Sequence, residues 1–375
     1  MNANRATPGP SSAQDRQGLW LAVVSGERSG PAATVARLGL AALSGLYRAG
    51  LAVRNLQFRM PGAVRRAPCP VVSVGNLTVG GTGKTPMVAY LARLVVEMGG
   101  RPVIVSRGYG TQSGRPNEEA QELAQLCPGV PHIQNPDRCR ALQEWAAANP
   151  CDLAILDDGF QHRRLARDLD IVLIDALRPF GFGRLLPRGL LREPVSALRR
   201  AGMVIITRAE LADAADVAKL RQTLAAAVRP GTPVLVAEHR VTGVRMPDGS
   251  LQDASWLRGQ DVAAACGIGN PDAFRRTLKG TGARVTLFDA YPDHHAYSAA
   301  DLARLVRSAA DAGLKTLVTT GKDYVKWRPL MAGLSGPPVV DVVAVEVAFQ
   351  VVDGEPALRR DIGALLAGQP GLGGR

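Results

Sequence analysis

After Pro70 the chain alternates short apolar, β-branched segments with stretches in which apolar residues recur every three or four positions. The short segments predict strands buried on both faces, and the longer ones predict the helices that cover them. The first series of expected strands is 71–75, 102–106, 153–157, 171–175 and 203–207. The second series has strands at 262–266, 285–288 and 316–320, with helices at 271–278 and 299–312 between them. This alternation predicts an α/β fold of two three-layer lobes with mainly parallel sheets.

Two further segments, 233–245 and 339–351, alternate apolar and polar residues in the manner of half-exposed strands. Each is followed by a turn sequence, at Pro247–Gly249 and Asp353–Gly354. We expect the two segments to pair as a β-ribbon hinge that joins the lobes. The expected division of the chain is a flexible tail (1–30), a helix (31–59), a first domain (60–231), a linker ribbon (232–258), a smaller α/β domain (259–337), a returning linker strand (338–352) and a C-terminal tail (353–375).

The helix expected at 31–59 has an unusual surface. Its charged residues are all arginines, and leucines and valines such as Leu38, Leu46 and Val53 stand among them. A helix of this kind either packs on the neighbouring domain or lies in a membrane interface, where each arginine adds about 1 kcal/mol near an anionic leaflet. We favour the interfacial helix. The sequence has no run of roughly 18 uncharged apolar residues, the length that a spanning helix needs.

The formal net charge of +12 favours an acidic partner, such as an anionic membrane surface or a phosphorylated substrate. Aromatic residues make up 5% of the chain and do not interleave with basic ones, so we expect no nucleic-acid partner. The five cysteines are scattered, without a C-x-x-C pair. This spacing predicts reduced thiols in a cytosolic protein.

A glycine-rich turn stands between the strand expected at 71–75 and a helix expected at Thr85–Met98. Backbone N–H groups and the positive helix end converge there, which suits the phosphates of ATP. The Lys84 ammonium would reach the outer phosphates, and the Thr85 hydroxyl would bind Mg²⁺. The strict pattern has glycine where this chain has Thr78, but a turn that served backbone geometry alone would not need Lys84 and Thr85. The expected nucleotide site consists of Gly80, Gly81, Thr82, Gly83, Lys84 and Thr85.

A pair of aspartates, Asp157 and Asp158, ends the strand expected at 153–157. Carboxylates at this edge of a parallel sheet lie near a phosphate-binding loop on the adjacent strand and can hold Mg²⁺. An isolated Asp-Asp-Gly is usually only a turn. Together with the glycine-rich loop, it predicts a metal site and a lobe of the P-loop, Rossmann-like type.

Together these stretches resemble the tetraacyldisaccharide 4′-kinases of lipid A biosynthesis. The resemblance runs in order from about residue 31 to about residue 350 and takes in Ser106–Tyr109, Arg178–Pro187, Leu191–Pro194, Gly267–Pro271, Pro292–His295 and Lys322–Asp323. It implies transfer of the γ-phosphate of ATP to the 4′-hydroxyl of a tetraacyl glucosamine disaccharide 1-phosphate. It also implies a monotopic enzyme on the cytoplasmic face of the inner membrane of a Gram-negative-type bacterium, with two lobes joined by a strand ribbon.

The resemblance further implies a base formed by a carboxylate and a histidine. The histidine matches His294, but the family's Gly-Asp-Glu-Pro stretch corresponds to Asn117–Ala120 here, which puts Glu118 in the aspartate's place. Glu118 also fits a plain acidic helix start. With Lys84 and Asp158, these residues form the expected catalytic group. Substrate contacts are expected from Asn76, Arg107, Gln161, His162 and Arg192.

Two other functions stay open at the level of the residues. A nucleotide-driven switch or assembly ATPase also uses a Gly-Gly-Thr-Gly-Lys-Thr loop, although the base-reading motif of GTP switches has no counterpart at Gly321–Tyr324. An inactive membrane-associated scaffold would account for the altered stretch around Glu118. Phosphate transfer onto the lipid disaccharide distinguishes the kinase from both.

Overall fold

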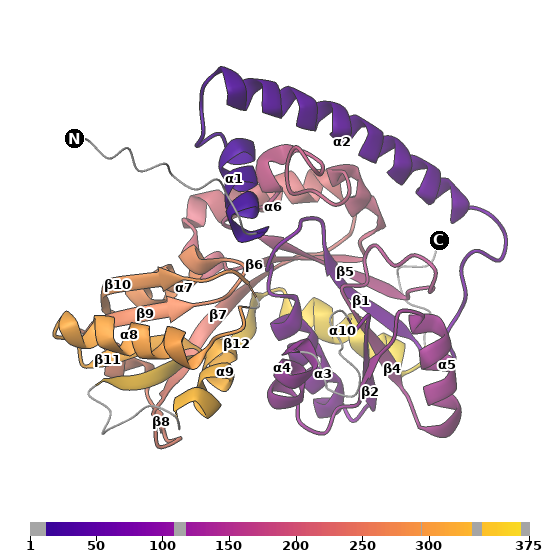
Figure 1. Cartoon of the computed structure of the whole chain (residues 1–375). Helices are drawn as coiled ribbons and strands as arrows, with labels where there is room; N and C mark the ends of the chain where they lie inside the picture. The colour runs from indigo at the N-terminus through magenta and orange to yellow at the C-terminus, as the bar shows by residue number, and fades with distance from the viewer. Residues whose placement is uncertain (1–12, 109–117, 294, 332–339, 369–375) are drawn as a thin grey trace. The chain divides into compact units, whose positions relative to one another are not determined.

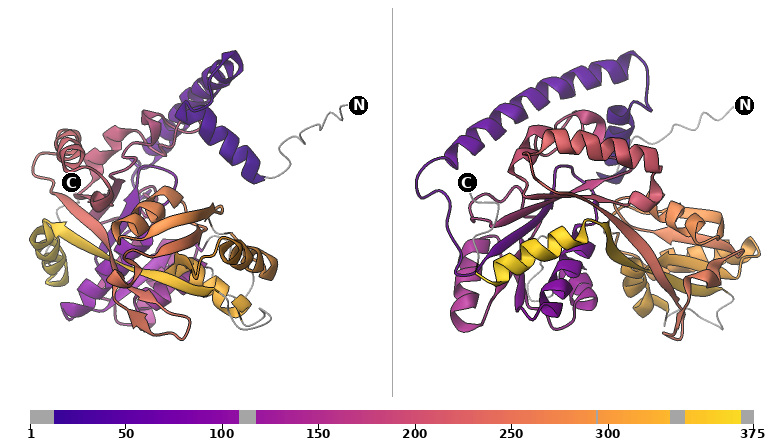
Figure 2. Two further views of the ribbon diagram at one scale, coloured as in Figure 1. Left: turned by 90° about the vertical axis from the view of Figure 1, so that its left-hand side faces the viewer. Right: turned by 180° about the vertical axis from the view of Figure 1, so that it is seen from behind.

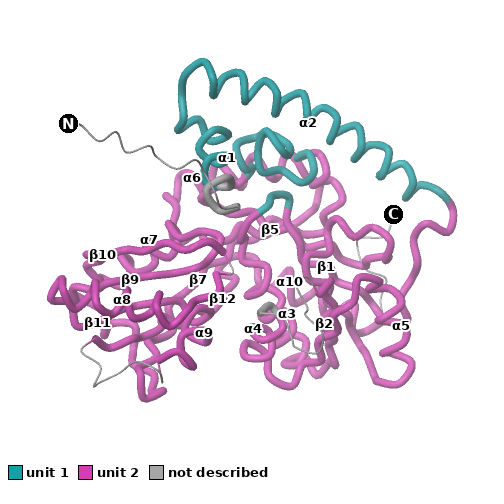
Figure 3. Tube along the Cα trace, viewed as in Figure 1, with its two compact units in different colours: residues 1–60, 77–79, 180–195 teal, residues 61–76, 80–179, 196–375 magenta. Residues whose placement is uncertain are grey.

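The computed structural model describes residues 13–108, 118–293, 295–331 and 340–368, without the side chains of residues 13–17, 118 and 119. The chain divides into two compact units, coloured separately in Figure 3. Unit 1 comprises Met1–Met60, Leu77–Val79 and Phe180–Val195, and unit 2 comprises Pro61–Asn76, Gly80–Pro179 and Ser196–Arg375.

One mainly parallel sheet runs through unit 2 (Figure 1), in the order β10-β9-β11-β12-β7-β6-β5-β1-β4-β2-β3 with β8 beside β7. Among the described strands, the antiparallel pairs are β12 with β7 and β7 with β8. The strands are β1 (Val71–Asn76), β2 (Pro102–Ser106), β3 (His132–Gln134), β4 (Leu153–Asp157), β5 (Leu169–Asp175), β6 (Met203–Thr207), β7 (Val234–Arg245), β8 (Leu251–Gln252), β9 (Asp261–Cys266), β10 (Arg284–Ala290), β11 (Thr316–Thr320) and β12 (Asp341–Asp353).

The join between the two series of strands is the pair β7 and β12, the segments that alternate in sequence. The first residues of β7 pair with β6 in parallel, and most of its length pairs with β12. Both series therefore belong to one continuous sheet, because β7 is long enough to be shared between them. The chain is an α/β protein in which a ribbon of two antiparallel strands connects two parallel halves.

The helices of unit 2 cover both faces of this sheet (Figure 2). Every residue of β1, β2, β4, β5 and β6 is buried, which explains their largely apolar sequences. The helices are α3 (Lys84–Glu97), α4 (Glu118–Leu126), α5 (Arg138–Ala148), α6 (Ala214–Ala227), α7 (Pro271–Gly280), α8 (Ala299–Asp311), α9 (Gly321–Met331) and α10 (Glu355–Leu366).

The core of unit 2 consists of separate apolar clusters, which lie on the faces of the two halves of the sheet. In the first half, α3, α4 and α10 share one apolar cluster with the sheet, and α5 packs in a cluster on β1, β2 and β4. In the second half, α8 and α9 pack in one cluster, and α7 packs in another. Each half thus has three layers, as the sequence predicts.

The C-terminal tail expected at 353–375 is largely a helix, so that expectation is wrong for residues 355–366. Leu358, Ile362 and Leu365 of α10 are buried in the core that α3 also lines, at the spacing of a helical stripe. Gly354, with a φ of 85°, begins α10 and does not close a hairpin. Burial of this apolar stripe stabilises α10, although the sequence that follows it is rich in glycine.

Unit 1 contains α1 (Ala13–Ser25), α2 (Pro31–Gln57) and the segment 180–195. The expected flexible tail at 1–30 is therefore wrong for residues 13–25. The indole Nε1 of Trp20 donates to the carbonyl of Pro187 at 2.8 Å, and Val24 is buried, so α1 has tertiary contacts that its sequence does not reveal. No helix in the described residues combines the length and apolar character needed to cross a membrane.

Side chains of α2 hold the segment 180–195 within unit 1. The Ser44 hydroxyl donates to the carbonyl of Leu185 at 3.0 Å, and the Tyr47 hydroxyl donates to that of Arg192 at 3.0 Å. Arg54 forms an ion pair with the fully buried Glu193 at 3.3 Å. Polar residues of α2 thus face the segment 180–195, and many apolar residues of α2 are exposed.

Candidate active site

The loop between β1 and α3 ends in an open helix N-terminus. Gly80 and Gly83 have φ angles of 110° and 83°, values that favour glycine. Gly83 stands at the N-cap position of α3, where no described side chain makes a capping hydrogen bond. The first N–H groups of α3 are thus available to an anion, and the macrodipole favours negative charge there.

Buried side chains hold this loop in shape. The Asn76 Nδ2 donates to the Thr82 hydroxyl at 2.9 Å, and the Thr207 hydroxyl donates to the Thr82 carbonyl at 3.1 Å. Gln161 Nε2 donates to the carbonyl of Asn76 at 2.9 Å. Asn76 is fully buried. These contacts favour loop support for Asn76 and Gln161 in place of the expected substrate contacts, because their amide groups already donate inside the protein.

The aspartate pair lies at the carboxyl edge of the sheet beside the loop. Strands β1 and β4 are adjacent and parallel, with Val74 opposite Asp157. The Lys84 ammonium lies 3.8 Å from Asp158 Oδ1. Asp158 has a φ of 48°, a left-handed conformation that costs energy outside glycine and that Asp and Asn tolerate best. The tight bend turns the Asp158 carboxylate toward Lys84.

A cavity of about 1070 Å³ within unit 2 opens onto this loop. All six residues from Gly80 to Thr85 line it, and so do Asn270, Asp293 and Lys322 of the second half. A cavity of this size is large enough for a nucleotide. The first and second halves of the sheet thus both contribute side chains to one site.

Two glycines, Gly81 and Gly269, lie close together where the two halves meet. A Cβ built on Gly269 would lie 2.9 Å from the backbone nitrogen of Gly81 and 3.0 Å from Asp293 Oδ2. Such distances are too short for a side chain, so Gly269 is required for this approach. The turn Gly267–Asn270 therefore lies directly against the glycine-rich loop between β1 and α3.

Lys322 brings a second ammonium to the cavity. Its Nζ lies 3.4 Å from Asp293 Oδ1. Burial acts to lower the pKa of Lys322, but the charges of Asp293 and Glu122 outweigh burial, and the pKa is raised. Lys322 therefore stays cationic at neutral pH.

Asp323 is a buried carboxylate that fixes the turn at Gly267. One carboxylate oxygen accepts hydrogen bonds from the Gly267 N–H at 2.9 Å and from the Thr320 hydroxyl at 2.8 Å. Asp323 is 0% exposed. Asp323 thus connects the start of α9 to the turn Gly267–Asn270, which contacts the glycine-rich loop.

Replacement of Asp323 tests this connection. We expect Asp323→Ala to lower the free energy of unfolding by roughly 1–3 kcal/mol, because it leaves a buried N–H without its acceptor. Asp323→Asn retains an acceptor oxygen at the same place and should be closer to the wild type. Urea unfolding of both variants measures the difference, and equal stability of the alanine variant and the wild type would contradict the role.

The cavity includes residues that the sequence did not single out. Arg208, left-handed at φ 57°, follows β6 and forms an ion pair with Asp175 at the end of β5. Burial and the charge of Arg208 lower the pKa of His239 on β7 to about 3, so its imidazole is neutral. Burial raises the pKa of Glu210 to about 7. A second cavity of about 640 Å³ shares Glu210 and His239.

The positions of Arg208 and Asp175 at strand ends were a usable signal, since carboxyl edges of parallel strands carry sites. His239 gave no signal, because alternation in β7 does not reveal its neighbours. The imidazole of His239 would be 3.0 Å from a Cβ built on Gly83. This contact is a second reason, besides φ, why glycine is needed at position 83.

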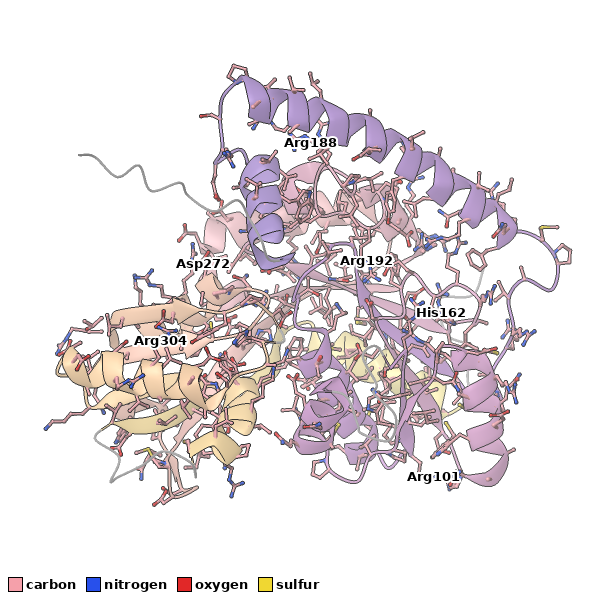
Figure 4. All side chains as sticks on the ribbon, in the orientation of Figure 1. Arg101, His162, Arg188, Arg192, Asp272 and Arg304 are labelled. Atoms are coloured by element: carbon pink, nitrogen blue, oxygen red, sulfur yellow. The ribbon has the colours of Figure 1, made fainter. Side chains whose placement is uncertain are left out.

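The other expected site residues are dispersed or lie outside the description. His162 is half-buried beyond β4 (Figure 4), and burial, followed by the charge of Arg138, lowers its pKa to about 4. Arg107 is exposed after β2. Arg192 belongs to unit 1, where its backbone N–H donates to the carbonyl of Leu77 at 2.7 Å. The Glu118 side chain and residue His294 are outside the described residues.

Residues 36–367 match the family model described as Tetraacyldisaccharide-1-P 4′-kinase. The chain belongs to this kinase family. It is 41% identical over 309 residues to the tetraacyldisaccharide 4′-kinase of Syntrophus aciditrophicus, a match that covers 76% of this chain and 82% of the relative. It is 40% identical over 332 residues to the enzyme of Anaeromyxobacter dehalogenans strain 2CP-C, covering 83% and 86% of the two chains.

A solved member of the tetraacyldisaccharide 4′-kinase family has the same fold. The crystal structure described as the "apo" form of LpxK from Aquifex aeolicus in complex with ATP aligns with a TM-score of 0.65. The identity is 29%, and the alignment covers 88% of this chain and 99% of that chain. The α/β fold expected from the sequence, and the resemblance to this kinase family, are confirmed.

Proposed function

We propose that this kinase transfers the γ-phosphate of ATP to the 4′-hydroxyl of a tetraacyl glucosamine disaccharide 1-phosphate, in lipid A biosynthesis. The observation that carries the proposal is the 3.8 Å pair of Lys84 and Asp158 at the open N-terminus of α3. Family membership supports the substrate. The net charge of +12 suits an acidic acceptor that carries a phosphate.

Positioning and charge neutralisation dominate phosphoryl transfer. Backbone N–H groups from Gly80 to Lys84 bind the phosphates of ATP, and the Lys84 ammonium neutralises charge that develops on the transferring group. Lys322, which lines the same cavity from the second half, adds a second ammonium. The turn at Gly269 helps to exclude water by closing on the loop.

Magnesium fits the oxygen donors present. The Thr85 hydroxyl and the carboxylates of Asp157 and Asp158 are hard ligands of the type that Mg²⁺ prefers. When bound, the ion neutralises phosphate charge and orients the nucleotide. Asp158 then also positions Lys84, since its carboxylate lies 3.8 Å from the Lys84 ammonium.

The deciding experiment uses purified full-length protein, ATP, Mg²⁺ and the tetraacyl disaccharide 1-phosphate in detergent micelles. We expect a product with a second phosphate, detected by mass spectrometry, and equimolar ADP. ATP hydrolysis without phosphorylated lipid would favour a switch or assembly ATPase, and neither reaction would favour an inactive scaffold. Either result would overturn the proposal.

For the base we propose Glu118, with His294 as its partner. Support comes from the family register and from α4, which begins at Glu118 and contributes Gln121 and Glu122 to the cavity wall. We expect Glu118→Gln to lower kcat by about 10²–10⁴-fold while ATP binding is unchanged, because only proton transfer is lost. Glu119→Gln is the matched control. Normal turnover by the Glu118 variant would reject the assignment without affecting the kinase proposal.

We further propose that α2 binds an anionic membrane surface, which places the enzyme on the cytoplasmic face of the inner membrane. Five apolar residues of α2 are each 60–71% exposed: Val35, Leu38, Leu46, Val53 and Leu56. An exposed apolar row of this kind on an arginine-bearing helix is typical of interfacial binding.

The double variant Leu38→Glu/Leu46→Glu tests the membrane surface. Each inserted leucine adds roughly 1.5–3 kcal/mol, so loss of both should weaken binding to phosphatidylglycerol vesicles by about 100-fold or more. Leu251→Glu, at a residue 56% exposed in unit 2, is the control and should bind normally. Undiminished sedimentation of the double variant with vesicles would refute the role of α2.

A further inference from the structure

Two of the five cysteines lie together at the end of the sheet opposite the candidate site. The Sγ atoms of Cys69 and Cys151 are 2.9 Å apart. Cys69 stands two residues before β1, and Cys151 stands two residues before β4. These strands are adjacent and parallel, and the Ala154 N–H donates to the Pro70 carbonyl at 2.8 Å. The pairing of β1 with β4 thus holds the two thiols side by side.

The two thiols differ in burial and in pKa. Cys69 is buried, whereas Cys151 is half-buried and reaches solvent. The thiol of Cys69 hydrogen-bonds to Cys151, which lowers the pKa of Cys151 and raises that of Cys69. Burial and the charge of Asp152 act to raise the pKa of Cys151, but the hydrogen bond from Cys69 outweighs them and the pKa is lowered. Figure 4 labels Arg101, which lies just before β2 at this end of the sheet. Cys151 is therefore the more nucleophilic and more accessible member.

We propose that Cys69 and Cys151 form an oxidisable dithiol that closes to an intramolecular disulfide under peroxide and leaves the nucleotide site intact. The sulfurs need to approach by only about 0.9 Å to reach the ~2.05 Å of a disulfide bond. Of the other three cysteines, Cys139 is buried in the same apolar cluster as Cys69 and Cys151, but the sulfur–sulfur contact observed among the described residues is that of Cys69 with Cys151. The Cys127 thiol donates to the Leu123 carbonyl at 3.0 Å, and Cys266 is buried in the core of the second half.

The chemistry balances with hydrogen peroxide as the oxidant. The Cys151 thiolate attacks one peroxide oxygen, the O–O bond breaks, and the second oxygen leaves as water after taking up a proton. The Cys69 sulfur then attacks the sulfenic acid of Cys151, the S–O bond breaks, and a second water leaves. Two thiols and one peroxide thus give one disulfide and two waters.

The bridge would join the amino ends of β1 and β4. The glycine-rich loop and the aspartate pair follow the carboxyl ends of the same two strands. A bridge at the amino ends constrains the unfolded chain without altering the site, and it protects Cys151 from further oxidation. The dithiol is thus a protective and stabilising element, and it need not control activity.

The test treats the full-length reduced protein with a twofold excess of hydrogen peroxide, removes the oxidant and counts thiols in denaturant. We expect the count to fall from five to three, a Cys69–Cys151 peptide in the non-reducing digest and a higher midpoint of thermal unfolding that dithiothreitol reverses. ATP binding should stay within about twofold of the reduced protein. The thiol count does not depend on the proposed kinase activity.

Two variants make the outcome specific. Cys266→Ala should still lose two thiols, and Cys69→Ala should lose the bridge and instead trap a sulfenic acid at Cys151, detected with dimedone. A count that stays at five, or a bridge to another cysteine, would overturn the proposal. Loss of ATP binding on oxidation of the wild type would overturn its second part.

Discussion

Lys84→Met is expected to lower the rate of phosphate transfer by about 10²–10³-fold, because loss of a cation aimed at developing charge typically costs about 3–4 kcal/mol of the barrier. The ammonium of Lys84 lies 3.8 Å from Asp158 and lines the cavity. Methionine keeps most of the unbranched stem of the side chain and removes the ammonium group. The measurement is single-turnover transfer from labelled ATP to the lipid acceptor, which separates the chemical step from product release.

The control is Lys219→Met, at an exposed residue of α6. It should transfer phosphate at the wild-type rate. Thermal unfolding of both variants verifies that the fold is kept. A Lys84 variant with wild-type single-turnover kinetics would exclude Lys84 from the transferring site.

Asp158→Asn is expected to raise the Mg²⁺ concentration required for half-maximal activity, and to lower the maximal rate by about 100-fold, since a charged ligand near the phosphates is lost. Asparagine tolerates the left-handed φ of 48° at this position, so the backbone bend survives the change. Asp158→Ala changes both charge and backbone, and comparison of the two variants separates these effects. Activity is measured as a Mg²⁺ titration at fixed ATP.

A matched control stands at the other end of the same strand. Asp152 precedes β4 and pairs with Arg101 at 2.8 Å, far along the strand from the glycine-rich loop. Asp152→Asn should leave the Mg²⁺ titration unchanged. If Asp158→Asn and Asp152→Asn titrate alike, Asp158 does not act through the metal.

The buried strands could be predicted well from sequence, and the reason is physical. Helices cover both faces of β4 and β6, so all positions before the last residue of each strand are apolar, and the segments 153–157 and 203–207 match the structure. Helix α6 was missed. It buries Leu220 and Leu224 within an alanine-rich sequence, so it has little amphipathic contrast.

The candidate site could be predicted only where a motif is local. The sequence identified Gly80–Thr85 and the aspartate pair because each is a continuous stretch beside a strand end. It could not show that β7 brings His239 to Gly83, or that the turn at Gly269 meets Gly81. These approaches join residues more than 150 positions apart, and the pattern of neither segment contains information on the other.

The pair β7 and β12 limits how the two halves of the sheet can move relative to each other. No peptide linker of independent flexibility separates the halves there, since main-chain hydrogen bonds connect them along the ladder. The irregular register between Glu346 and Val347 lies in the cavity wall, and a bulge at such a place increases local twist. A change in the width of the cavity would therefore have to come from a change in the twist of this ladder.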